Sequence, residues 1–146
     1  MGYNFYGWEV ATVPAQTDEY KGIDTPRKLY DALSKVWCEY TCAPRLREQW
    51  SEDNMTLGQC SITAFLVQDI FGGEVYGIHR PGGNYHCYNV VDGNVFDLTS
   101  EQFGDEVLSY QENPIQTREE HFAKEEKYLR YLFLKEHLKK YLEEIS

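Results

Sequence analysis

The stretch LGQCSITAFLVQDIFGG, residues 57–73, begins with a cysteine behind Gly-Gln and ends on two glycines. Between them, apolar residues from Ile62 to Phe71 occupy most of the circumference of a helix, which is typical of a helix buried at the centre of a domain. Gly72 and Gly73 allow the left-handed backbone that ends a helix. We therefore expect a central helix over residues 60–71, with Cys60 at its N-terminal end.

Short segments rich in Val, Ile and aromatic residues follow this helix: EVYGIHR, NYHCYNVV and NVFDLT. They are separated by Pro-Gly-Gly at 81–83 and by Asp-Gly at 92–93, and the second pair is a strong signal for a two-residue hairpin turn. The pattern predicts a three-stranded antiparallel meander. A buried helix followed by such a sheet indicates the α+β class.

Helices are also expected on both sides of this centre. One helix is expected to start with Asp24 or Thr25 as its cap and Pro26 in its first turn, and it has apolar residues at helical spacing from Leu29 to Trp37. A shorter helix is expected to start at Pro44. Residues 117–145 predict one long helix, whose stripe packs either on its own domain or on a neighbouring molecule; the stripe consists of Tyr131, Leu134, Leu138, Tyr141 and Ile145. We expect a single domain over 1–146, with a core over about residues 25–110.

Charge and hydropathy exclude several classes of partner. The 146 residues carry a formal net charge of −10, so the surplus of Lys and Arg that nucleic acid or an anionic membrane would require is missing. No apolar run is long enough to span a bilayer, and the first residues lack the order of a signal peptide. We expect a cytoplasmic protein whose four cysteines are reduced thiols.

Three side chains form a candidate catalytic set. Cys60 lies at a helix N-terminus, where the helix dipole favours the reactive thiolate. His86 falls in the second strand and Asp97 in the third. A two-residue turn at 92–93 pairs Val91 with Asn94, and continuing the register brings Asp97 onto the face of His86, one diagonal step away.

These positions predict a division of roles. Asp97 orients the imidazole of His86, and His86 takes the proton from Cys60. Gln59, or the backbone N–H of Cys60, binds the oxyanion of a tetrahedral intermediate. Taken singly, each residue has an ordinary structural explanation: Cys60 as core packing, His86 as a hydrogen-bonded core residue and Asp97 as a cap for the following turn. Taken together, their order and register make the catalytic and the structural interpretations about equally well supported.

A zinc site is the other chemical interpretation. Cys38, Cys42, His86 and Cys87 are possible ligands, but Cys38 and Cys42 have a loose spacing and His86 and Cys87 point to opposite faces of a strand. We expect no metal and no cofactor, and we assign Cys87 to the core. The remaining histidines, His79, His121 and His137, are interpreted as surface or packing residues.

The segments GQCSITAFLVQDIFGGEV and HCYNVVDGNVFDLTSEQF resemble the YunG-like family of small bacterial proteins of uncharacterised function. The resemblance covers about residues 37–103. It implies a papain-like α+β fold related to transglutaminase-like cysteine hydrolases, with Cys60, His86 and Asp97 as the triad. It also implies that Gln59 and Asn89 are supporting polar groups.

The function expected from these observations is thiol-dependent acyl transfer, most simply hydrolysis of a peptide or another amide or ester. The alternative is a binding or regulatory module that keeps the scaffold without turnover, because a fold does not fix a function. An open cavity at Cys60 beside His86 would favour the enzyme.

Overall fold

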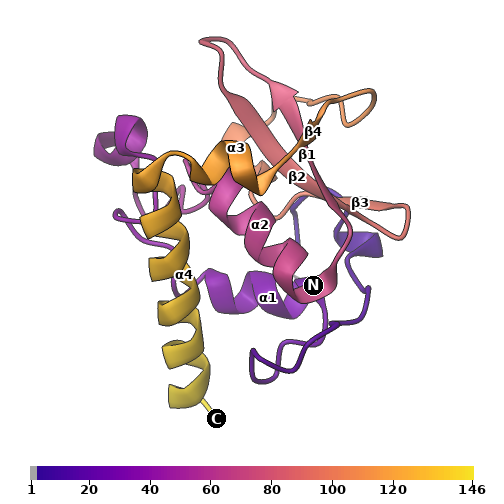
Figure 1. Ribbon diagram of the computed structural model, residues 1–146, viewed down its shortest axis with the longest axis vertical. Helices are drawn as coiled ribbons and strands as arrows, with labels where there is room; N and C mark the ends of the chain where they lie inside the picture. The colour runs from indigo at the N-terminus through magenta and orange to yellow at the C-terminus, as the bar shows by residue number, and fades with distance from the viewer. Residues whose placement is uncertain (1–2) are drawn as a thin grey trace.

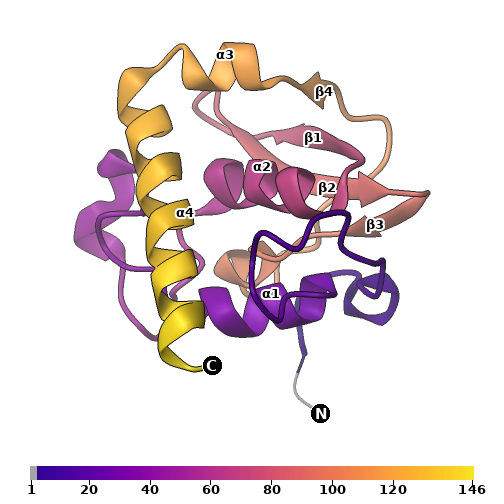
Figure 2. The same cartoon turned by 60° about the horizontal axis from the view of Figure 1, so that its bottom comes forward.

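The computed structural model describes residues 3–146 and places helix α2 (Cys60–Phe71) in the middle of the molecule (Figure 1). It lies between a sheet on one side and helices α1 (Pro26–Leu33) and α4 (Glu125–Glu144) on the other (Figure 2). Nine side chains of α2 are buried around most of its circumference. The helix predicted over residues 60–71 is therefore confirmed.

The sheet contains the predicted meander and one further strand. Strands β1 (Glu74–His79), β2 (Tyr85–Val91) and β3 (Asn94–Phe96) pair antiparallel, and β4 (Ile115–Gln116) pairs with the outer edge of β1, giving the order β3-β2-β1-β4. The protein is thus α+β with a small antiparallel sheet. Two residues are too few to show an alternating pattern, so the sequence did not predict β4.

The hairpin between β2 and β3 has the predicted register. Val91 lies opposite Asn94 and Asn89 opposite Phe96, across a turn in which Asp92 and Gly93 both have positive φ. The ladder ends at Phe96, one residue earlier than expected. Asp97 forms a bridge with Tyr6 instead, and its N–H donates to the Tyr6 carbonyl at 2.9 Å.

Helix α1 begins as predicted but ends earlier. The Thr25 side chain caps it by accepting a hydrogen bond from the Lys28 N–H, and the helix stops at Leu33 rather than continuing to Trp37. Trp37 is still buried, because the turn after α1 brings its indole N–H to the Thr63 hydroxyl of α2 at 3.0 Å. The predicted short helix after Ala43 is a 3-10 helix, Pro44–Gln49, and two others are Trp8–Val10 and Ser100–Phe103.

The single C-terminal helix predicted from Thr117 is wrong. The structure has α3 (Arg118–Phe122) and then α4, separated by Lys124 in an extended conformation. The Phe122 ring packs between Phe65 of α2 and Tyr131 of α4, which fixes the bend. Helix α4 packs against α1 and α2 of the same chain, so its apolar stripe is covered without a neighbouring molecule.

The buried face of α4 also differs from the prediction at its end. Ile145 is exposed, and the helix ends before it; the buried residues are Arg130, Tyr131, Leu134, Leu138 and Leu142. Side chains before residue 25 join the same core, among them Phe5 and Tyr20. Among the helices of residues 3–146, none is both long and apolar enough to cross a membrane.

Candidate active site

The loop before α2 places Cys60 at the first residue of the helix, with its side chain partly exposed. Gly58 has a φ of 72°, and a side chain there would come within 2.5 Å of the Cys42 sulfur. Its carbonyl accepts the Ala43 N–H at 2.9 Å, which ties the loop to the preceding segment. No side chain caps α2, so the N–H groups of its first turn have no side-chain acceptor there and favour a negative charge near Cys60.

The sulfur of Cys60 lies beside an open edge of β2. Strand β3 pairs only with Asn89–Val91, so the first residues of β2 have no strand partner on that side. Cys60 Sγ lies 3.8 Å from the Tyr85 carbonyl oxygen and accepts a hydrogen bond from the Cys87 N–H. The sulfur is therefore next to two neighbouring side chains, those of His86 and Cys87, that leave the strand on opposite faces.

Hydrogen bonds hold the pKa of the Cys60 thiol well below its ordinary value. The largest contribution is a hydrogen bond from the Cys87 thiol, and His86 adds a hydrogen bond and a positive charge, which together outweigh the opposing effect of burial. The same contact and burial raise the pKa of Cys87 well above its ordinary value. Cys60 is thus the thiolate of the pair. Cys87 is buried in the core as expected, but its role as a donor was missed.

This contact predicts that two substitutions of Cys87 differ in their effect on the alkylation rate of Cys60. Cys87→Ala removes the donor and should slow alkylation of Cys60 by iodoacetamide near pH 6 by about three- to tenfold. Cys87→Ser keeps a hydroxyl donor at the same place and should stay close to the unaltered protein. Equal rates in Cys87→Ala and in the unaltered protein would show that the Cys87 thiol does not stabilise the thiolate.

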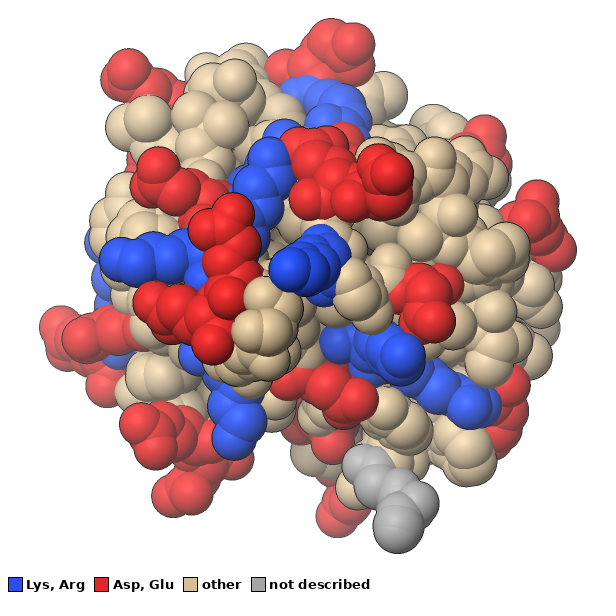
Figure 3. Space-filling model, turned by 90° about the horizontal axis from the view of Figure 1, so that it is seen from below, with Lys and Arg blue, Asp and Glu red and all other residues tan. Residues whose placement is uncertain are grey.

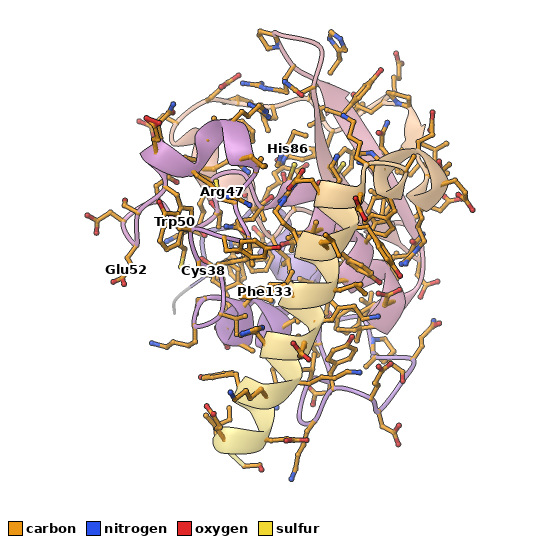
Figure 4. The ribbon with its side chains drawn as sticks, turned by 60° about the vertical axis from the view of Figure 1, so that its left-hand side comes forward. Cys38, Arg47, Trp50, Glu52, His86 and Phe133 are labelled. Carbon is orange, nitrogen blue, oxygen red and sulfur yellow. The ribbon has the colours of Figure 1, made fainter. Side chains whose placement is uncertain are left out.

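His86 and Asp97 make the contact that the hairpin register predicts. His86 Nε2 lies 2.6 Å from Asp97 Oδ2, and both side chains are at most 2% exposed. Burial lowers the pKa of His86, but the charge and hydrogen bond of Asp97, followed by the contact with Cys60, raise it to about 10. The imidazole is therefore protonated at neutral pH. Figure 4 shows His86 in the interior, behind the segment that carries Arg47.

The second ring nitrogen of His86 is the one available to Cys60. Among residues 3–146, the buried Nδ1 has no hydrogen-bond partner. Because Nε2 is held by Asp97, Nδ1 is the ring nitrogen left to interact with Cys60, whose proximity helps to raise the pKa of His86. A Cys-His pair needs this arrangement, with one nitrogen held by a carboxylate and the other free to exchange a proton with the thiol.

Asp97 is held by groups that the sequence analysis missed. Its Oδ1 accepts the Thr99 N–H at 3.2 Å, and its Oδ2 accepts the Tyr110 hydroxyl at 2.7 Å. Tyr110 stacks on Tyr6, with ring centroids 3.9 Å apart. No local pattern marks Tyr110, because it lies in an irregular loop. The one signal in the sequence is indirect: a buried carboxylate such as that of Asp97 needs more than one hydrogen-bond donor, and His86 supplies only one.

The two supporting residues have structural contacts. Gln59 is fully buried and its Nε2 donates to the Cys38 carbonyl at 3.2 Å, so its amide is not directed at the space in front of Cys60. Asn89 donates to the Ala64 carbonyl of α2 at 2.9 Å and so joins the strand of His86 to the helix of Cys60. Of the two expected oxyanion donors, the backbone N–H of Cys60 is the one near the sulfur.

A cavity of about 680 Å³ opens in front of Cys60. It is bounded by the N-terminal end of α2, the tip of the β1–β2 hairpin, α3 and the first turn of α4. Cys60 and Ser61 line it, whereas His86 is buried and is not part of its lining. His121 also lines it, so the interpretation of this histidine as a surface or packing residue was incomplete.

The proposed zinc ligands are not gathered into one group. Within residues 3–146, no three or more His, Cys, Asp and Glu side chains come together in a way that suits a metal ion. Cys42 is buried against Gly58, and Cys38 contributes its carbonyl to Gln59. The Cys38–Cys42 segment thus supports the loop before Cys60.

The fold and the site define a small α+β protein with a cysteine at a helix N-terminus facing a His-Asp pair on a sheet. The chain belongs to the YunG family: residues 25–143 match the family model described as YunG protein. It is 38% identical over 98 residues to "Uncharacterized protein YunG" of Bacillus subtilis (strain 168), which covers 66% of this chain and 78% of that protein. No solved structure matches the sequence. The family match extends beyond residues 37–103 and includes α4.

Proposed function

We propose that this protein is a thiol-dependent hydrolase or acyl transferase, with Cys60 as nucleophile, His86 as acid and base and Asp97 as the residue that orients His86. The observation that carries the proposal is the position of the Cys60 sulfur between a buried His86-Asp97 pair and an open cavity. The arrangement of a helix-borne cysteine and a strand-borne histidine supports a relation to papain-like and transglutaminase-like proteins.

The residues account for each step of acyl transfer. The Cys60 thiolate attacks the carbonyl carbon of an amide or ester, a C–S bond forms, and the carbonyl oxygen takes the electron pair next to the Cys60 N–H. The tetrahedral intermediate collapses and the C–N or C–O bond breaks, while His86 gives its proton to the leaving group. Water, or an amine in a transferase, then loses a proton to His86 and attacks the thioester. Collapse releases the product and the thiolate.

Incubation with 4-nitrophenyl acetate tests this proposal. We expect a rapid release of nitrophenolate together with transfer of one acetyl group, which mass mapping should place on Cys60, followed by slow loss of the acetyl group to water. Cys60→Ser should lose the rapid phase, because a serine hydroxyl has no comparable anionic form at neutral pH. Cys38→Ser is the matched control and should keep it.

Two results would contradict the proposal. One is absence of acetyl transfer to Cys60 in folded protein. The other is acetylation of Cys60 at the same rate in the unaltered protein and in His86→Ala. Either result would favour a binding or regulatory module that keeps the scaffold without turnover.

A further inference from the structure

Lys127 places a positive charge in the cavity that holds Cys60. It lies in the first turn of α4, is half-buried and lines the same cavity as Cys60 and Ser61. No carboxylate within residues 3–146 forms an ion pair with it. The Cys60 thiolate is one of the groups with which it interacts electrostatically. Charged groups that are partly buried are usually paired with an opposite charge, so a half-buried ammonium group without a carboxylate partner is unusual.

A neutral histidine holds Lys127 in place. The Lys127 ammonium donates to His121 Nδ1 at 2.9 Å, and His121 Nε2 lies 2.8 Å from Gln116 Oε1. Burial and the positive charge of Lys127 lower the pKa of His121 to about 4, so at neutral pH His121 accepts at Nδ1 and donates at Nε2. The chain of contacts fixes one ammonium hydrogen and leaves the others for a ligand.

The lining of the cavity contrasts with the rest of the protein. The chain has a net charge of −10, and acidic side chains are spread over the face seen in Figure 3, with basic ones between them. Four cations and two carboxylates line the cavity, and Arg130 is paired with the carboxylate of Glu126. The other carboxylate is Glu120, and the cations without an ion pair among the described residues are Arg45, Lys124 and Lys127. Unpaired cations concentrated beside a nucleophile favour an anionic substrate.

We propose that the substrate of this site carries a carboxylate, and that Lys127 binds it while Cys60 attacks the neighbouring carbonyl carbon. The inference rests on the proposed function, because it specifies the substrate class of the same cavity. A carboxylate accepts hydrogen bonds from the free ammonium hydrogens of Lys127 and offsets the excess of positive charge in the cavity. Peptides with acidic side chains and amides next to a free carboxyl group have this chemistry.

Two alkylating reagents of equal size test the carboxylate separately from turnover. Iodoacetate carries a carboxylate where iodoacetamide carries a neutral amide, and both report on Cys60 by mass mapping. We expect Lys127→Met to lower the iodoacetate-to-iodoacetamide rate ratio by about five- to tenfold at low ionic strength. Lys140→Met removes the same charge from an exposed position on the same helix and should leave the ratio unchanged.

The measurement is made at pH 7.5, where even an ordinary thiol with a pKa of about 8.5 is partly ionised and can be labelled. The ratio therefore tests the carboxylate site even if the protein does not turn over esters. An unchanged ratio in Lys127→Met, or an equal fall in Lys140→Met, would overturn the inference. If acetyl transfer to Cys60 were still seen, the proposed function would stand without it.

A second measurement needs no variant and guards against misfolding of Lys127→Met. Glutarate should protect Cys60 of the unaltered protein from iodoacetamide, whereas glutaramide, its neutral diamide, should protect much less. Raising the salt concentration should weaken the protection by glutarate, because an exposed cavity is screened. Equal protection by the two compounds would contradict a carboxylate site at Lys127.

Discussion

Replacing His86 with alanine should slow alkylation of Cys60 near pH 6 by at least about tenfold, because the thiolate loses its hydrogen bond and its positive neighbour. The measurement is the pH profile of iodoacetamide labelling at Cys60, followed by mass mapping. In the unaltered protein, labelling should already be rapid at mildly acidic pH and should map to Cys60, with the buried Cys42 and Cys87 silent. In His86→Ala, the profile should shift to higher pH.

Asp97→Asn provides the graded comparison. Asparagine still holds the imidazole but removes the negative charge that raises the pKa of His86, so the shift should be smaller than in His86→Ala. The same labelling profile for His86→Ala and the unaltered protein, with a midpoint near the ordinary thiol value of about 8.5, would mean that Cys60 merely begins a buried helix.

The parts of the site that follow from local patterns could be predicted from the sequence. The Asp92-Gly93 turn fixes the register of one hairpin, and that register is sufficient to bring His86 to Asp97. The start of α2 follows from the glycine and the apolar run around Cys60. Both inferences depend on contacts between residues near in sequence, where turn chemistry and side-chain alternation act directly.

The missed parts depend on contacts between distant segments. Tyr110 reaches Asp97 from an irregular loop, and Lys127 and His121 reach the cavity only because the chain bends between α3 and α4. A helical pattern running through residues 117–145 hides that bend, since each half has helical spacing on its own. Cys87 was assigned by the face of its strand, but the Cys60 sulfur lies at the strand edge, where both faces are within reach.

Replacing Asp97 with alanine should destabilise the protein by about 3–5 kcal/mol, the cost typical of removing one partner from a buried ion pair. His86 would lose the carboxylate that compensates its burial, and the donors of Thr99 and Tyr110 would lose their acceptor. Urea unfolding followed by circular dichroism measures the difference. Both proteins should carry Cys60→Ala, because ionisation of that thiol changes stability with pH in the opposite direction.

The pH dependence of this difference identifies His86 as its source. Asp97 and Cys60 together raise the pKa of His86 to about 10 in the folded protein, compared with about 6.5 in an unfolded chain. With Cys60 replaced by alanine, the effect of Asp97 remains and the folded value lies lower than in the unaltered protein. A group with a raised pKa stabilises the folded state fully below the unfolded value, and the contribution is lost as the pH rises through the folded value. The difference in free energy of unfolding should therefore be largest near pH 6 and should shrink as the pH rises above about 6.5.

A cavity left by the shortened side chain would produce a different result. Loss of packing does not depend on protonation, so it would lower the stability of Asp97→Ala equally from pH 6 to pH 9. Burial and the charge of Asp97 raise the pKa of Tyr110, so its hydroxyl stays neutral over this range and adds no slope. A difference that shrinks with rising pH thus reports the ion pair, and a constant difference would show that Asp97 only fills space beside His86.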